Sequence, residues 1–254
     1  RLPKTTKALP TQRGEGFCLA AAGCRMPEAR FAERRLVATA DGSHSLYLPA
    51  IGEHYHSSHG ALLESLHVFI GNGYEVAAEL PRPMLHVLEI GFGTGLNALL
   101  TWERSRSRGL PLVYTAIEPY PLEDGLVARL NHPEHLSSTK ARALFDAMHR
   151  CAWGSGQRLD DHFTLQKLHS RFDQFKPQGR YDLVYHDAFS PDVQPELWTS
   201  EVFARLAGCM SSGAVLVTYS AKGEVRRHLR SVGLTVERLP GPPGKREMTR
   251  ARQS

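Results

Sequence analysis

The sequence predicts an α/β fold with a mostly parallel, twisted sheet. A β-hairpin and a helix precede the sheet, and an antiparallel hairpin strand closes its C-terminal edge. From Pro83 onward, short apolar runs alternate with stretches of helical spacing, which is typical of parallel strands joined by right-handed crossovers. The 254 residues, 41% of them hydrophobic, suffice for one large domain or one domain with an appendage. No stretch approaches the ~18 unbroken apolar residues of a membrane-spanning helix.

Two elements are expected before the sheet. Residues 36–40 and 43–48 flank Asp41-Gly42, a dipeptide that supplies the positive φ angles of a tight hairpin turn. Residues 61–70 have apolar side chains at helical spacing, and Gly71-Asn72-Gly73 is expected to end this helix. We therefore divide the chain into a basic N-terminal segment (1–35), a hairpin and helix extension (36–80) and a main domain (81–254).

The main domain is expected to alternate strands with helices. The predicted strands are residues 85–90, 112–117, 162–168, 181–186, 214–219 and 234–239, followed by a last strand that begins within 245–249. The predicted helices are residues 96–104, 122–130, 139–151, 195–209 and 222–232, the last with its arginines directed outward. A short turn joins the final two strands, so they should form an antiparallel hairpin at one edge of the sheet.

Charge is distributed unevenly along the chain. The net charge is +5. Residues 1–35 carry eight basic and three acidic residues and residues 222–254 carry nine and three, whereas the middle carries fourteen and twenty. Basic ends on an acidic body indicate a core whose flanks attract a polyanion such as RNA, although solvated basic tails explain the charges equally well.

The four cysteines are too sparse for a disulfide scaffold. They include no CxxC pair and stand at Cys18, Cys24, Cys151 and Cys209. This usage is typical of a reducing compartment, so we expect a cytoplasmic protein.

A glycine-rich turn follows the first predicted strand of the sheet. Glu89 ends the strand, and Gly91, Gly93 and Gly95 alternate before Asn97. Ligands of open parallel sheets bind beyond the carboxyl ends of the strands, and glycines let the backbone approach a flat ligand closely. Taken alone, the loop could also be an ordinary structural turn.

An acidic residue ends the next predicted strand. Glu118, 29 residues after Glu89, can accept hydrogen bonds from both hydroxyls of an adenosine ribose. The glycines follow a GxGxG spacing rather than the GxGxxG of dinucleotide sites. S-Adenosylmethionine, a nucleoside cofactor without a pyrophosphate, is therefore favoured over NAD or FAD.

A third strand end carries Asp187 and Phe189. If the cofactor is a sulfonium methyl donor, Asp187 can orient an attacking amine. A free alkylamine has a pKa of roughly 10 and is mostly protonated at neutral pH, so Asp187 is better suited to positioning and late proton acceptance than to a simple anionic clamp. The alternative is a buried Asp that caps a helix.

Other constellations are weaker. His54, His56 and His59 lie close together but lack a helical HExxH frame and a nearby cysteine, so we expect no metal. No GxSxG nucleophile elbow is present. Lys245 and Arg246 adjoin a predicted hairpin and could hold a phosphate.

With these residues assembled, the sequence resembles the MnmC-like tRNA methyltransferases, in particular the stand-alone MnmD form. The most specific matching motifs are GFGTGLN at residues 91–97, DAFSP at 187–191 and GKREM at 244–248. The other matching stretches are residues 54–60, 64–73, 88–90, 196–198, 222–227 and 240–243. The resemblance covers roughly residues 36–250, whereas residues 1–35 match nothing.

The resemblance implies a class I, Rossmann-like methyltransferase domain at residues 81–254. Such an enzyme uses S-adenosylmethionine to methylate the amine of 5-aminomethyluridine, often 2-thiolated, at the tRNA wobble position. Carried over by motif, the roles would be as follows: Glu89, Gly91, Gly93, Gly95, Asn97 and Glu118 line the cofactor; Asp187 and Phe189 lie beside the methyl group and the base; Tyr55, Glu64 and Asn72 close the pocket. The expected RNA contacts are Arg226, Arg227, Lys245 and Arg246.

Bifunctional relatives carry a following FAD-dependent oxidase domain. Since this sequence ends at Ser254, we expect no FAD and a substrate that arrives already in its aminomethyl form. Two alternatives stay open. One is a non-catalytic RNA-binding module on the same fold; the intact acids Glu89, Glu118 and Asp187 favour the enzyme over it. The other is a polyamine aminopropyltransferase, whose acidic substrate groove would not explain the basic chain ends.

Overall fold

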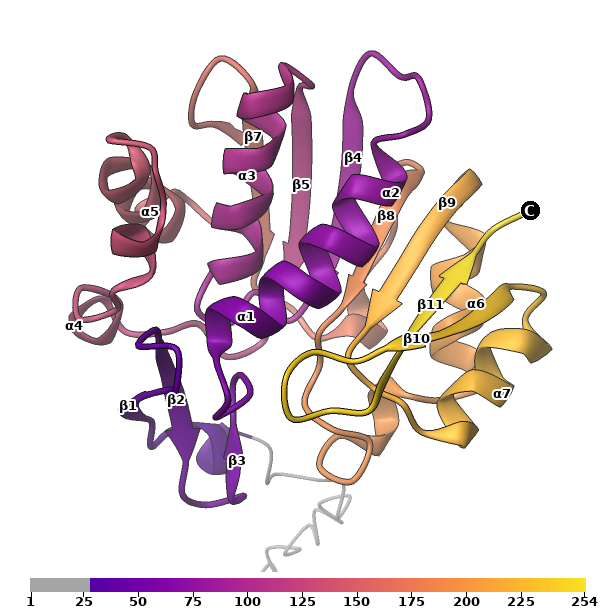
Figure 1. Cartoon of the computed structure of the whole chain (residues 1–254), viewed down its shortest axis with the longest axis horizontal. Helices are drawn as coiled ribbons and strands as arrows, with labels where there is room; N and C mark the ends of the chain where they lie inside the picture. Colours follow the sequence, from indigo (N-terminus) through magenta and orange to yellow (C-terminus); the bar gives the residue numbers. More distant parts are fainter. Residues whose placement is uncertain (1–27) are drawn as a thin grey trace, which may run out of the picture.

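A central sheet dominates the computed structural model, which describes residues 28–254 (Figure 1). Its strands are β4 (Leu85–Ile90), β5 (Leu112–Ile117), β6 (Gln157–Arg158), β7 (Phe163–Leu168), β8 (Tyr181–His186), β9 (Met210–Thr218), β10 (Thr235–Pro240) and β11 (Glu247–Arg252). Their order is β10-β11-β9-β8-β4-β5-β7-β6. Neighbours from β9 to β7 pair in parallel, while β11 is antiparallel to both β9 and β10. The predicted parallel sheet and its antiparallel edge hairpin are therefore confirmed.

Helices cover both faces of this sheet. They are α3 (Leu96–Arg108), α4 (Asp124–Val127), α5 (Ala141–Arg150), α6 (Ser200–Gly208) and α7 (Gly223–Ser231), with 3-10 turns at Glu28–Phe31, His132–His135, Phe172–Gln174 and Pro195–Leu197. Val87 packs in one buried cluster with residues of α3 and α5, and its neighbour Leu88 packs in a second cluster with residues of α6 and α7. Successive side chains of a strand point to opposite faces, so β4 is buried on both sides.

The predicted helix over residues 195–209 is interrupted. A 3-10 turn at Pro195–Leu197 is followed by α6, whose N-cap Thr199 accepts a hydrogen bond from the Val202 amide. Between them, the Trp198 indole N–H donates to the Phe189 carbonyl at 2.8 Å. This hydrogen bond joins the start of α6 to the loop after β8.

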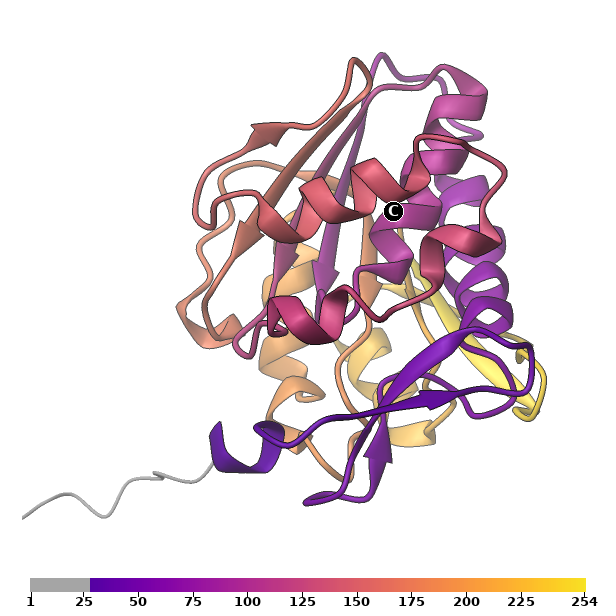
Figure 2. The same ribbon diagram turned by 90° about the vertical axis from the view of Figure 1, so that its left-hand side faces the viewer.

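A small sheet lies at the carboxyl ends of the parallel strands, beside the loop between β10 and β11 (Figures 1 and 2). It consists of β1 (Arg35–Ala38), β2 (His44–Leu48) and β3 (Glu53–His54), all antiparallel. The predicted hairpin is confirmed, and Gly42 in its turn has a φ of 83°. The Asp41 carboxylate accepts hydrogen bonds from the Ser43 amide at 3.0 Å and the Leu63 amide at 2.9 Å, which joins the hairpin to the next helix.

That helix does not end where the sequence predicts. It begins as α1 (Ala61–Ser65), continues as the π-helical segment η2 (Leu66–Tyr74) and finishes as α2 (Glu75–Ala77). The prediction that Gly71-Asn72-Gly73 stops the helix is therefore wrong. A Cβ on Gly73 would lie 2.9 Å from Val217 and 3.0 Å from Tyr185, so this glycine lets the helix approach the sheet rather than leave it.

Gly73→Ala is expected to lower the free energy of unfolding. Overpacking against Val217 and Tyr185 costs about 1–3 kcal/mol, which exceeds the gain of up to about 1 kcal/mol from replacing a helical glycine. Gly125→Ala in α4 is the matched control, because nothing lies within 4 Å of its added methyl group. Urea denaturation of both variants checks this prediction, and an equal or smaller loss for Gly73→Ala than for Gly125→Ala would contradict it.

The basic N-terminal segment predicted at residues 1–35 lies mostly outside the described residues, as do Cys18 and Cys24. Within residues 28–254, no helix is long and apolar enough to cross a bilayer.

Candidate active site

A cavity of about 600 Å³ opens at the carboxyl ends of the parallel strands. It lies where β4 is flanked by β5 on one side and β8 on the other, the reversal point at which open α/β sheets bind ligands. The loops after β3, β4, β5 and β8, together with the loop between β10 and β11, contribute to its wall. The predicted site residues on this wall are Tyr55, Glu64, Gly91, Gly93, Asn97, Glu118, Asp187, Phe189 and Lys245.

The glycine-rich turn brings the backbone of two loops together. Gly91 has a φ of 94°, and a Cβ there would lie 2.8 Å from the Asp187 carbonyl oxygen. A Cβ on Gly93 would meet the Tyr55 ring at 3.2 Å, on the wall of the cavity. Gly95 instead forms the left-handed N-cap of α3, faces Phe92 and His149, and does not line the cavity.

Glu118 is held by the backbone at the end of β5. Its Oε2 accepts a hydrogen bond from the Gly93 amide at 2.9 Å, and its Oε1 accepts one from the Tyr120 amide at 2.7 Å. Burial raises its pKa, while these two hydrogen bonds oppose the rise. The carboxylate is therefore fixed on the wall, with lone pairs left for a ligand that donates hydrogen bonds.

Asn97 connects two acids. Its Nδ2 donates to Glu89 Oε1 at 3.0 Å and to Asp187 Oδ2 at 2.8 Å. Asn97 Oδ1 is buried without a partner in the described structure. Glu89 is 1% exposed and lies behind Asn97 rather than on the wall. Burial, with the Asp187 charge as a second cause, raises the pKa of Glu89 well above its usual range.

Asp187 is set up to exchange a proton near neutral pH. Burial is the largest cause that raises its pKa to about 8, and the Glu64 charge adds to the rise. The Asn97 hydrogen bond and the Lys245 charge act in the opposite direction. A carboxyl group with this pKa can accept a proton from a ligand and return it to solvent.

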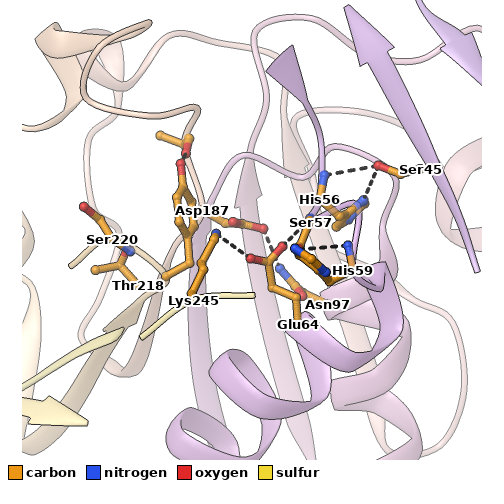
Figure 3. Close-up of polar contacts among 12 residues, drawn as sticks. Ser45, His56, Ser57, His59, Glu64, Asn97, Asp187, Thr218, Ser220 and Lys245 are labelled. Carbon is orange, nitrogen blue, oxygen red and sulfur yellow. Dashed lines mark hydrogen bonds and ion pairs between the residues drawn. The ribbon is translucent and has the colours of Figure 1, made fainter. Parts of the chain in front are cut away.

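Lys245 lines the cavity and points toward Glu64. Its Nζ lies 2.6 Å from Glu64 Oε1 (Figure 3) and 4.0 Å from the centre of the Tyr219 ring. The second Glu64 oxygen accepts a hydrogen bond from the Ser57 amide at 2.7 Å. Tyr219 was not among the predicted site residues, although its place as an aromatic residue at the carboxyl end of a predicted strand is a signal that could have indicated it.

Aromatic side chains form another part of the wall. Tyr55 packs edge-on against Phe189, with 5.1 Å between ring centres. Phe31 packs against Phe189 and stacks on Tyr120 at 4.3 Å. Arg34 donates to the Tyr55 hydroxyl and to the Tyr120 carbonyl. Tyr120 lies on the wall after β5, whereas Phe31 and Arg34 contact wall residues without lining the cavity themselves. The sequence did not indicate these three residues, because no local pattern shows that the segment before β1 packs against Tyr55, Tyr120 and Phe189.

The remaining predicted residues lie elsewhere. The Asn72 amide donates to the His67 carbonyl inside the π-helical segment and does not line the cavity. Arg227 and Arg246 are exposed. Arg226 is 6% exposed, donates to Thr249 and pairs with Glu247 at 2.9 Å. The expectation that all arginines of this helix point outward is wrong, because α7 packs on β11 through Arg226.

The histidines near residue 56 form no metal centre. His56 is half-buried, its ring lies within hydrogen-bond distance of the Ser45 hydroxyl, and loss of hydration lowers its pKa to about 4. Among residues 28–254, no group of three or more His, Cys, Asp or Glu side chains is arranged to hold a metal ion.

Comparisons with known proteins agree with this geometry. A family described as S-adenosyl-L-methionine-dependent methyltransferase matches residues 162–254. The bifunctional protein MnmC of an Azoarcus species, named for tRNA 5-methylaminomethyl-2-thiouridine biosynthesis, is 35% identical over 222 residues, which cover 81% of this chain and 34% of MnmC. The corresponding protein of Chromohalobacter salexigens is 35% identical over 82% of this chain and 31% of its own length. The chain thus spans about a third of the length of these curated relatives.

Solved structures give the same picture. The crystal structure of MNMC2 from Aquifex aeolicus matches with a TM-score of 0.71 and 26% identity, covering 86% of this chain and 70% of that one. Spermidine synthase from Thermotoga maritima matches with a TM-score of 0.51 and 15% identity, over 87% of this chain and 68% of that one, and shares the fold alone. The chain belongs to the MnmC-like S-adenosyl-L-methionine-dependent methyltransferases.

Proposed function

We propose that the protein methylates the amine of 5-aminomethyluridine, 2-thiolated or not, at the wobble position of tRNA. The observation that carries the proposal is a single cavity lined by two chemically different groups of residues. The Gly91–Gly93 turn and Glu118 form one group, and Asp187 and Glu64 form the other. The names of the MnmC relatives support tRNA as the substrate, which would place the reaction in the cytoplasm.

The group of residues around Gly93 and Glu118 fits S-adenosylmethionine. The Glu118 carboxylate is fixed by two backbone amides and can accept hydrogen bonds from ribose hydroxyls. A side chain on Gly93 would fill the space beside Tyr55. Asn97 Oδ1 is a buried acceptor without a partner in the described structure. When bound, this cofactor supplies a methyl group on a positively charged sulfur that a neutral amine can attack.

The group of residues around Asp187 removes a proton from the substrate amine and orients it. The substrate arrives largely as an ammonium ion, which has no lone pair. The Asp187 carboxylate accepts one proton from it and leaves a neutral nitrogen, and Asp187 later releases that proton to water. Phe189 and Tyr55 give the base an aromatic surface on which to stack. Orientation of the amine by these groups accounts for most of the expected acceleration.

A labelling assay tests the function. The purified chain is incubated with methyl-labelled S-adenosylmethionine and tRNA from a strain that lacks the modification, and the nucleosides are analysed by mass spectrometry. We expect one labelled methyl group on the aminomethyl nitrogen of the wobble uridine. Label on another nucleoside, or tRNA binding without label, would overturn the proposal. The second of these results would favour the non-catalytic RNA-binding module.

Two neighbouring arginines of α7 are expected to have different roles, one in the stability of the fold and the other in tRNA binding. Arg226→Ala removes donors from Thr249 and Met248 and is expected to cost about 1–3 kcal/mol of stability, with no change in the salt dependence of tRNA binding. Arg227→Ala is expected to leave stability unchanged and to lower the slope of log K against log salt by about one. Denaturation and binding at several salt concentrations check both expectations, and the opposite assignment would contradict them.

A further inference from the structure

We propose that Glu64, Tyr219 and Asp187 form a subsite for an alkylammonium group, and that the Lys245 side chain fills this subsite until the substrate amine displaces it. The inference rests on the proposed function only for the identity of the displacing amine. The subsite itself is argued from contacts within this chain.

The contacts of Lys245 are those expected for a bound ammonium ion. Its Nζ makes an ion pair of 2.6 Å with Glu64 and lies 4.0 Å above the Tyr219 ring. A carboxylate on one side and an aromatic face on another are the two groups that recognise a desolvated cation. Figure 3 shows Lys245 beside Glu64, with Asp187 next to them.

Glu64 requires a cation at this position. It is 6% exposed, and a buried carboxylate without a counter-charge is costly. One of its oxygens is already held by the Ser57 amide, so its other oxygen faces the cavity and pairs with Lys245. If Lys245 leaves, the carboxylate attracts another cation.

Tyr219 and Asp187 belong to the same rigid wall. The Tyr219 hydroxyl donates to the Ala188 carbonyl at 2.8 Å, and the Asp187 amide donates to the Ile90 carbonyl at 3.0 Å. The aromatic face is thereby fixed beside the loop that carries Asp187. An amine that replaces the Lys245 ammonium would lie between the Glu64 carboxylate and the group that accepts its proton.

Lys245 is placed where its side chain can reach solvent. It lies in the loop between β10 and β11, follows Gly244 with a φ of 83°, and keeps 34% of its side chain exposed. Its charge sits on a flexible four-carbon stem that can turn to solvent when another ammonium group takes over the contact with Glu64. Its terminal CH2–NH3⁺ group also has the same chemistry as an aminomethyl substituent, so the substrate and the lysine compete for the same contacts.

Calorimetry with the free nucleoside 5-aminomethyluridine tests the inference without a methyl donor. Lys245→Ala removes the internal competitor, so the Kd for this nucleoside is expected to fall by about tenfold, the size of one ion pair and one cation–π contact. Uridine, which has no ammonium group, should bind equally to both proteins. Lys140→Ala removes the same charge from an exposed position outside the cavity wall and should leave the Kd unchanged.

A double variant tests whether the gain in affinity for the nucleoside depends on Glu64. Adding Glu64→Gln to Lys245→Ala is expected to reverse the gain, with thermal melting used to confirm that both proteins are folded. Equal or weaker binding of 5-aminomethyluridine to Lys245→Ala than to the natural chain would overturn the inference. So would a gain that survives Glu64→Gln. If the nucleoside binds as expected but tRNA is not methylated, the proposed function is wrong and the subsite is retained. If tRNA is methylated but Lys245→Ala does not strengthen nucleoside binding, only the subsite is wrong.

Discussion

Asp187→Asn is expected to lower kcat for tRNA methylation by about 100-fold or more and to leave the affinity for S-adenosylhomocysteine unchanged. The amide keeps the size of the side chain and can still contact Asn97, but it cannot accept the proton of the substrate ammonium. Loss of a positioned general base costs about 10²–10⁴ in rate. Single-turnover kinetics measure the first quantity and calorimetry the second.

The pH dependence of kcat/KM is an independent test of this role of Asp187. Burial and Glu64 raise the pKa of Asp187 to about 8, and only the carboxylate form accepts a proton. The value of kcat/KM should therefore rise with pH until about 8, and this limb should be absent in Asp187→Asn. An equal loss of turnover and of cofactor affinity would instead place Asp187 on the cofactor.

Glu118→Ala should weaken the binding of S-adenosylhomocysteine by about 1–3 kcal/mol, or about 5- to 150-fold in Kd. The substitution removes a buried carboxylate that can receive the ribose hydroxyls. It also releases the Gly93 amide, which donates to Glu118 at 2.9 Å. Both losses affect the part of the cavity wall that is proposed to bind the ribose, so calorimetry should detect their combined effect on the Kd.

Glu123→Ala is the matched control for this experiment. Glu123 is exposed, lies five residues further along the chain at the N-cap of α4, and does not line the cavity. Its removal changes the net charge by the same amount and should leave the Kd unchanged. An unaltered Kd for Glu118→Ala would remove the ribose assignment.

The strands and the glycine turn could be predicted because their signals are local. The strands β4 and β8 appear as short apolar runs, since both of their faces are buried between helices. Gly91 and Gly93 adopt the positive φ angles that few other residues tolerate. Asp41-Gly42 forms the expected hairpin turn for the same reason.

The end of the first long helix could not be predicted in this way. Gly71 and Gly73 have the composition of a helix stop, yet the chain continues through them in π-helical form. The reason is the approach of Val217 and Tyr185 to Gly73, and both of these residues lie far away in the sequence. A glycine that permits close packing and a glycine that ends a helix cannot be distinguished by their immediate neighbours.

By itself, the sequence indicated that Gly91, Gly93, Glu118 and Asp187 lie at the carboxyl ends of the parallel strands, because strand ends and turn chemistry follow from short-range patterns. Tertiary structure alone decided that Arg226 is buried against β11 while Arg227 is exposed. It also decided that Lys245 turns inward to Glu64, 181 residues away. The direction of a long charged side chain depends on whether a buried partner of opposite charge lies within reach, and that is settled only when distant segments pack together.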